Sequence, residues 1–202
     1  MNEILEYIKQ KYQPTSLIVY GSYADGSNNQ SSDFDALVIS TVQNMYHDTA
    51  FVGNIQLDVF VYPKDYFEGE IDYNEFLQIF DGKILIDEEG CGAALKEAVL
   101  NYISGIASKS ETELTNEVEW CEKMLMRTKR HDTEGMFRWH WVLIDSLEIF
   151  CDLKNQFYFG PKKTLKWMEK NYPKAFEIYS RALFEFSEES LEQWILFLKN
   201  AR

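Results

Sequence analysis

The chain has 202 residues, of which 46% are hydrophobic and 15% are aromatic, which excludes a disordered chain and suffices for one large or two small domains. Its formal net charge is −13, and residues 1–90 contain 16 acidic but only 4 basic side chains. This acidic half repels phosphate backbones, so a long nucleic-acid partner is disfavoured and a small cationic substrate is favoured.

The sequence indicates a cytoplasmic protein. No apolar run approaches the ~20 residues that a membrane span needs. Residues 1–13 resemble neither a signal peptide nor a transit peptide. Cys91, Cys121 and Cys151 lack the spacing of metal ligands, so we expect reduced thiols that serve packing.

Residues 1–90 alternate between helical and strand patterns. Ile4, Ile8 and Tyr12 fall on one helical face, and Pro14 ends that helix. The polar segment 22–32 is rich in turn-forming residues, and its first residues can open a short helix. The other elements expected here are strands over 16–20, 34–40 and 55–62, a helical stretch around 65–76, and a short edge-like strand within 82–90.

From Gly92 onward the pattern is helical throughout. Pro161 and Pro173 occupy first-turn positions, and Ser187 can cap the last helix. The expected helices cover 93–107, 111–129, 134–153, 161–171, 173–186 and 188–200. We therefore predict an α+β protein, with a catalytic domain of mixed sheet and flanking helices over 1–91 and a helical bundle over 92–202 that completes the nucleotide and substrate cleft.

Two carboxylates open the second expected strand. The first strand ends at Gly21-Ser22, and ten residues after Ser22 the sequence Asp33-Phe-Asp35 begins. Residues two apart in a strand point to the same face, so Asp33 and Asp35 present their carboxylates together. A divalent cation removes the repulsion between them, and Mg²⁺ prefers such ligands, with waters and substrate phosphates completing its shell.

A third carboxylate, Asp58, interrupts the apolar strand 55–62, where a charge is costly without a metal or a strong partner. If this strand lies beside that of Asp33 and Asp35, three carboxylates converge, and two Mg²⁺ ions can bridge a triphosphate and an attacking hydroxyl. Gly21 lets the backbone approach the phosphates, and Ser22 can donate to them.

This pattern of Gly21-Ser22, Asp33-Phe-Asp35 and Asp58 resembles the core of the DNA polymerase beta-type nucleotidyltransferase superfamily. The two-domain plan resembles its small aminoglycoside and lincosamide nucleotidyltransferases, some of which confer antibiotic resistance. Segments 137–150 and 159–168 resemble, more weakly, the helix-turn-Pro-Lys-helix segment of that group's C-terminal domain.

The resemblance implies transfer of a nucleoside monophosphate, usually AMP from ATP, to a substrate hydroxyl with release of pyrophosphate. It makes Asp33 and Asp35 metal ligands, and Asp58 a metal ligand or general base. We place Ser32 with Gly21 and Ser22 among the nucleotide-binding residues. Where many members have Arg a few residues after Gly-Ser, this chain has Asp25, so any phosphate or structural role of that Arg is absent.

A triphosphate needs cations beyond the metals, and residues 1–90 offer only four. The Gly160-Pro-Lys-Lys163 turn opens a helix and is the best other source. By the resemblance, Lys162 takes the place of the family's nucleotide-contacting lysine. Ordinary solvated lysines are an equally good interpretation of Lys162 and Lys163.

The remaining polar residues carry weaker signals. His131 and His140 are isolated and more typical of structural histidines. Glu134, Asp145 and Glu148 fit either the binding of a polycationic substrate or plain helix-surface charge.

The leading prediction is a nucleotidyltransferase that uses Mg²⁺ and ATP or another nucleoside triphosphate, with a small aminoglycoside-like acceptor. A protein-adenylylating, antitoxin-like enzyme and a non-catalytic nucleotide-binding or interaction protein are the alternatives, and a monomer and a homodimer both stay open.

Overall fold

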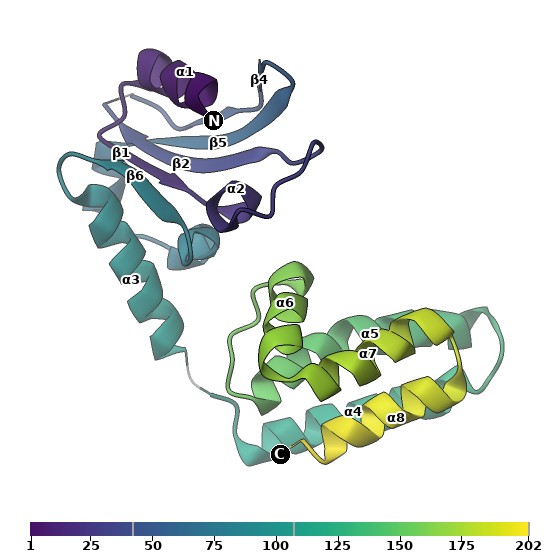
Figure 1. Cartoon of the computed structure of the whole chain (residues 1–202). Helices are drawn as coiled ribbons and strands as arrows, with labels where there is room; N and C mark the ends of the chain where they lie inside the picture. Colours follow the sequence, from purple (N-terminus) through teal and green to yellow (C-terminus); the bar gives the residue numbers. More distant parts are fainter. Residues whose placement is uncertain (42, 107, 202) are drawn as a thin grey trace. The chain divides into compact units, whose positions relative to one another are not determined.

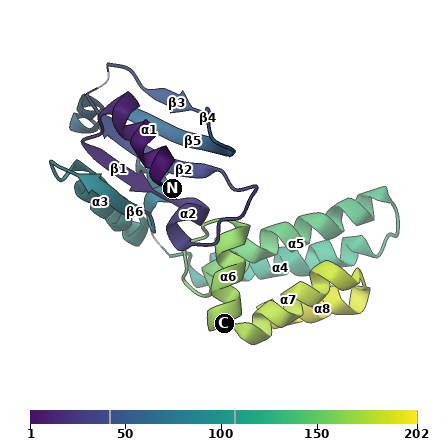
Figure 2. The same ribbon diagram turned by 45° about the horizontal axis from the view of Figure 1, so that its top comes forward.

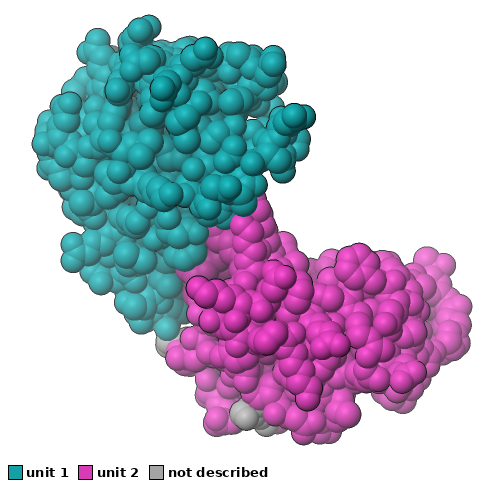
Figure 3. Space-filling model, viewed as in Figure 1, with its two compact units in different colours: residues 1–106 teal, residues 107–202 magenta. Residues whose placement is uncertain are grey.

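The chain folds into two compact units, Met1–Ile106 and Ala107–Arg202, coloured separately in Figure 3. The computed structural model describes residues 1–41, 43–106 and 108–201. A mixed sheet with helices forms the first unit and helices form the second, which confirms the predicted fold class. The units divide after Ile106 rather than after residue 91, because helix α3 (Cys91–Gly105) packs Leu95 and Val99 into the core of the first unit.

The sheet of the first unit has the strand order β3-β5-β2-β1-β6, with β4 paired to β5 (Figures 1 and 2). Among the strands of the described residues, only β2 and β5 pair in parallel. The strands are β1 (Ser16–Val19), β2 (Phe34–Ser40), β3 (Tyr46–Asp48), β4 (Phe51–Val52), β5 (Ile55–Pro63) and β6 (Lys83–Asp87). The four predicted strands are confirmed, whereas β3 and β4 are additions to the prediction.

Both faces of the sheet are covered, which is why its central strands are apolar on both sides. Helix α1 (Asn2–Tyr12) packs Ile4 and Ile8 against the face that carries Val38 and Val59. The opposite face carries Leu37 and lies against η2 (Tyr73–Ile79) and α3. Figure 2 shows α1 lying across the strands. The two layers hold β2 and β5 rigidly in register.

The expected helical stretch around 65–76 is wrong as a single element. The structure has two 3₁₀ helices instead, η1 (Lys64–Glu68) and η2. Gly69 takes an extended conformation between them, with φ −99° and ψ −160°, and Asp72 caps η2 by accepting a hydrogen bond from the Asn74 N–H. The segment after β1, whose first residues can open a short helix by their sequence, begins with α2 (Gly21–Asp25).

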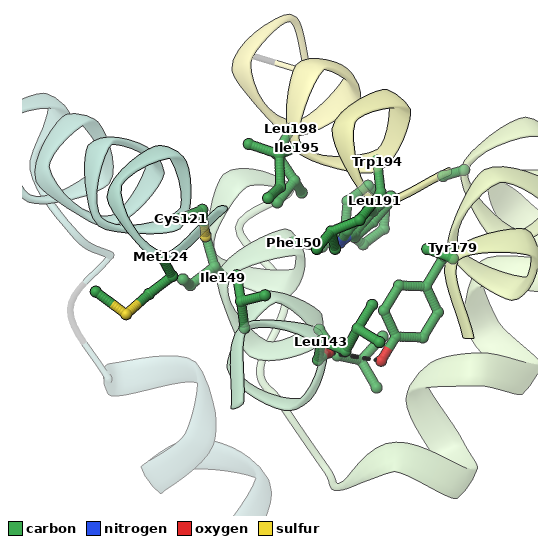
Figure 4. Packing of buried hydrophobic residues seen from close by; sticks show 14 of the residues in the cluster. Cys121, Met124, Leu143, Ile149, Phe150, Tyr179, Leu191, Trp194, Ile195 and Leu198 are labelled. Carbon is green, nitrogen blue, oxygen red and sulfur yellow. Dashed lines mark hydrogen bonds between the residues drawn. The ribbon is translucent and has the colours of Figure 1, made fainter. Parts of the chain in front are cut away.

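The second unit is a bundle whose helices agree with the predicted ones to within about two residues. The helix predicted over 93–107 corresponds to α3 of the first unit, and its last residue, 107, lies outside the described residues. Its core surrounds the fully buried Phe150 and Trp194 (Figure 4). The Tyr179 hydroxyl donates to the Leu143 carbonyl at 2.7 Å within this core. The helices are α4 (Glu111–Thr128), α5 (Thr133–Leu153), α6 (Pro161–Asn171), α7 (Pro173–Glu185) and α8 (Glu188–Lys199).

In the described ranges 1–41, 43–106 and 108–201, no helix has both the length and the apolar composition required to cross a membrane. Cys121 and Cys151 are buried free thiols of the bundle, as expected for packing cysteines. Burial raises the pKa of Cys121 to about 12 and that of Cys151 to about 11, so both stay protonated at neutral pH.

The edge strand β3 is tied to α1 by the buried carboxylate of Asp48, which is 1% exposed. Asp48 accepts hydrogen bonds from the hydroxyls of Tyr12 (2.8 Å) and Tyr7 (3.0 Å), the Lys11 ammonium (3.0 Å) and the Ala50 N–H (3.0 Å). A buried charge with four donors is well compensated, whereas an orphaned one is not. This network therefore anchors β3 to α1.

We predict that Asp48→Ala lowers the free energy of unfolding by about 3 kcal/mol at pH 7, because the buried Tyr12 hydroxyl and the Ala50 N–H lose their acceptor. Burial acts to raise the pKa of Asp48, but the hydrogen bonds from Ala50, Lys11, Tyr12 and Tyr7 bring it below its ordinary value. The contribution of Asp48 is thus fully present above the carboxyl's ordinary pKa of 3.8 and is lost as the pH falls through the lower, folded-state value. Urea unfolding of both proteins from pH 7 to pH 3 measures this.

The difference between wild type and Asp48→Ala should stay constant down to about pH 5 and shrink below about pH 4. The exposed Asp65→Ala serves as the control and should show no such difference. Equal stability of wild type and Asp48→Ala at neutral pH would contradict the anchoring role.

Candidate active site

Two carboxylates lie side by side on neighbouring central strands of the first unit. Asp35 on β2 is the register partner of Asp58 on the parallel strand β5. Their neighbours Phe34 and Leu57 are buried on the opposite face, whereas both aspartates are partly exposed. Residues in register on neighbouring strands point to the same face of a sheet. The predicted convergence of Asp35 and Asp58 is therefore what the strand pairing produces.

Gly21 supplies the space for one of these carboxylates. It adopts a left-handed conformation with φ +63°, at the point where β1 gives way to α2. The Tyr20 N–H before it donates to the Asp35 carbonyl at 3.1 Å. A Cβ atom at Gly21 would overlap Oδ2 of Asp35. Glycine is thus required twice over, by its backbone angle and by the close approach of the carboxylate.

The other predicted site residues have different surroundings. Ser22 is 6% exposed within α2, and Asp33 is exposed immediately before β2. The Ser32 hydroxyl oxygen accepts a hydrogen bond from the Asn29 N–H at 2.9 Å within the loop. Lys162 is an exposed second residue of α6, in the second unit. The nucleotide contacts of Ser22, Ser32 and Lys162 stay predictions.

Tyr20 is a site residue that the sequence analysis did not single out. Its ring is 7% exposed and belongs to the apolar cluster beneath the carboxylates. Burial, and after it the negative charges of Asp58 and Asp35, raise the pKa of its hydroxyl. A phenol with a raised pKa stays neutral at neutral pH, so Tyr20 adds no negative charge beneath the two aspartates.

His47 on β3 is a second residue that the sequence analysis missed. Its Nε2 lies 2.6 Å from Oδ1 of Asp58, and its ring stacks on Phe60 with centroids 4.1 Å apart and an interplanar angle of 5°. The only sequence signal was a histidine inside the short Tyr46–Asp48 strand, which was itself not predicted. The site therefore contains a carboxylate with an imidazole partner.

The carboxylate pair fits the divalent cation that the nucleotidyltransferase resemblance implies. Asp35 rests against a glycine that leaves room for its oxygen, and Asp58 keeps a second oxygen beyond the one that meets His47. Mg²⁺ takes one or two carboxylates and fills its shell with waters and phosphates, so two aspartates suffice. Among the described residues, no group of three or more His, Cys, Asp or Glu side chains forms a ready-made metal site. A ligand role for Asp33 thus stays a prediction.

A comparison with protein-family models agrees with this geometry. Residues 1–89 match the family model of the nucleotidyltransferase domain. A nucleotidyltransferase-like protein from Exiguobacterium sibiricum has a similar solved structure, with 13% sequence identity, 99% of this chain and 72% of that chain covered, and a TM-score of 0.41. No curated protein matches the chain.

The first unit thus contains a nucleotidyltransferase domain, and its carboxylate pair lies within the matched residues. Residues 1–89 match a domain family that takes nucleoside triphosphates as substrates and generally uses divalent metal ions. The resemblance to the aminoglycoside enzymes stays a prediction, as do the acceptor and the metal.

Replacing Gly21 with alanine tests the packing of the carboxylate. The Cβ atom would displace Asp35, and we expect nucleotidyl transfer to fall by at least about 100-fold. The matched control is Gly26→Ala, because Gly26 also has a positive φ, +79°, but a Cβ there meets nothing within 4 Å. Both variants should lose about 1–2 kcal/mol of stability from the left-handed backbone. Equal activity of the two variants would contradict the requirement for close approach at Gly21.

Proposed function

We propose that this chain transfers a nucleoside monophosphate, AMP from ATP, to a hydroxyl of a small cationic molecule and releases pyrophosphate. The observation that carries the proposal is the register pairing of Asp35 with Asp58 beside Gly21, inside the nucleotidyltransferase domain. An aminoglycoside-like acceptor satisfies the description, since it offers both hydroxyls and amines.

The reaction is a substitution at the α-phosphorus of the nucleotide. The acceptor oxygen forms a new bond to that phosphorus, the bond to the pyrophosphate oxygen breaks, and pyrophosphate leaves with the electron pair. Asp58 accepts the hydroxyl proton through its carboxylate. Asp33, Asp35 and Asp58 would hold Mg²⁺, two ions by the resemblance, and the metal would supply charge neutralisation for the triphosphate.

Positive charge for the phosphates is scarce in the first unit. Lys11 is committed to Asp48, and Lys64 is paired with Glu89. Lys162 is exposed at the beginning of α6 and follows Pro161. We therefore propose Lys162 as the protein's own cation for the nucleotide. The scarcity of free positive charge in the first unit makes binding of the triphosphate depend on divalent metal as well.

An acidic pocket in the helical bundle supports a cationic acceptor. The pocket has a volume of about 390 Å³ and contains four carboxylates and one ammonium group. Lys109 is occupied by ion pairs with Glu117 and with Asp152, the latter at 2.8 Å. Trp120 forms part of the wall and offers an aromatic face for cation–π contact. The remaining lining residues are Asn116, Asp145, Glu148 and Ile149.

The carboxylates of this pocket repel one another electrostatically. Burial raises the pKa of Glu148, and the negative charges of Asp152, Asp145 and Glu117 add to the effect, while Lys109 opposes it. An amine cation bound here would stabilise the ionised carboxylates and bring that pKa back down. The pocket is thus built to gain from positive charge.

The transfer reaction is tested by incubating the protein with Mg²⁺, ATP and a panel of aminoglycosides and lincosamides. We expect release of pyrophosphate and an acceptor mass increased by one AMP. Asp35→Asn should lower the rate by at least about 100-fold, because the pair loses a metal-binding charge. The control is Asp65→Asn, an exposed aspartate of η1 outside the pair.

If wild type and Asp35→Asn are equally silent with every acceptor, the small-molecule proposal is wrong. Mass transfer to a protein substrate would then identify the protein-modifying alternative, and failure to bind ATP with Mg²⁺ would favour the non-catalytic one.

The bundle pocket is tested with a polyamine or aminoglycoside by titration calorimetry. We expect Asp145→Asn and Glu148→Gln each to weaken binding about 5-fold, since each removes one partly solvated ion pair. The effect should shrink at high salt. Glu177→Gln, on the exposed face of α7, is the charge-matched control. Equal loss in the control and the pocket variants would assign the binding to net charge alone.

A further inference from the structure

We propose that His47 is a positioning residue that fixes the carboxylate of Asp58 for the reaction. The inference rests on the proposed function for the role of Asp58, and it adds a residue that lies outside the motif of glycine, serine and aspartates. It is carried by the hydrogen bond between His47 and Asp58 and by the way in which the strands hold both side chains.

The direction of the hydrogen bond follows from its partners. An ionised carboxylate can only accept, so Nε2 of His47 carries a hydrogen and donates it to Oδ1 of Asp58 at 2.6 Å. That bond commits one oxygen of Asp58 and leaves Oδ2 as the oxygen for the acceptor hydroxyl or the cation. A carboxylate on a partly exposed side chain otherwise rotates among several positions. The imidazole selects one of them.

The imidazole itself is held in place from two sides. Phe60 is the strand-register partner of His47, and the two rings stack almost in parallel at 4.1 Å. The residue that follows, Asp48, is locked into the buried network with α1. The short edge strand that carries His47 is thus anchored through the next residue, Asp48, although the side chain of His47 is itself 45% exposed.

The position of His47 is that of a hydrogen-bond donor that orients a metal-binding carboxylate. Hydrogen bonds to such ligands orient them, and their loss costs about 10- to 100-fold in metal affinity or activity. A mere surface ion pair would contribute little and would have no reason to be stacked. The stack and the strand anchor therefore favour an orienting role over an incidental contact.

The test compares His47→Ala with His47→Gln, whose side-chain amide retains an N–H donor. We expect His47→Ala to lower kcat about 10- to 100-fold while the KM for ATP changes less than about 3-fold, and His47→Gln to recover most of kcat. Mn²⁺ affinity, measured by electron paramagnetic resonance without nucleotide, should fall about 10-fold in His47→Ala and recover in His47→Gln. Phe60→Leu, which keeps the imidazole but removes the stack, should lie between wild type and His47→Ala.

The control is His131→Gln in the bundle, a histidine that faces Glu188 at 3.4 Å and should leave every value unchanged. If wild type transfers nucleotide but His47→Ala keeps its kcat and its Mn²⁺ affinity, the positioning role is overturned and the proposed function stands. If wild type transfers nothing yet His47→Ala binds Mn²⁺ more weakly than wild type, the proposed function fails and the positioning role stands. Unfolding curves of the His47 variants should coincide with that of wild type, because the His47 side chain is 45% exposed.

Discussion

The parallel pairing of β2 with β5 is the constraint on which the site depends. It sets Asp35 beside Asp58 in neighbouring strands, which lie about 5 Å apart. Two unit charges at that distance repel by about 3 kcal/mol in a partly solvated protein site. The apolar packing of both sheet faces holds the strands together against this repulsion, and the repulsion in turn creates affinity for a cation. The same strand pairing thus lowers the stability of the sheet, through the repulsion between Asp35 and Asp58, and creates the cation-binding site.

The surroundings of the pair limit where it can move. Gly21 has no side chain, so its backbone lies close to Asp35. Tyr20 is buried in the neighbouring apolar cluster with its phenol neutral. On the other side, His47 reaches Asp58 from an edge strand that Asp48 ties to α1. Gly21 thus restrains Asp35 and His47 restrains Asp58, and preorganisation of this kind is what a reaction between charged groups needs.

The two units have different chemical characters. The first contains the nucleotidyltransferase domain and nearly all of the chain's net negative charge. The second is nearly neutral overall, but it gathers four carboxylates around one pocket beside Trp120. Overall charge alone would have placed acceptor recognition in the first unit. The carboxylates gathered at the bundle pocket favour cation binding there as well. The net charge of the bundle does not indicate this, because Lys and Arg elsewhere on its helices offset the acidic residues.

The sequence by itself predicted most of the helices and strands and the residues of the motif. Helical and strand periodicity predicted α1, β1, β2, β5 and the bundle helices. Gly21, Asp35 and Asp58 could be recognised as candidates because each stands out within its own short segment of sequence. Tertiary structure decided what depends on long-range pairing. The three-residue strand β3 carries no clear pattern of its own, so the contact of His47 with Asp58, eleven residues away in the chain, arises only when β3 joins β5. Likewise, α3 reads as one more helix of the bundle, and only its packing against the sheet assigns it to the first unit.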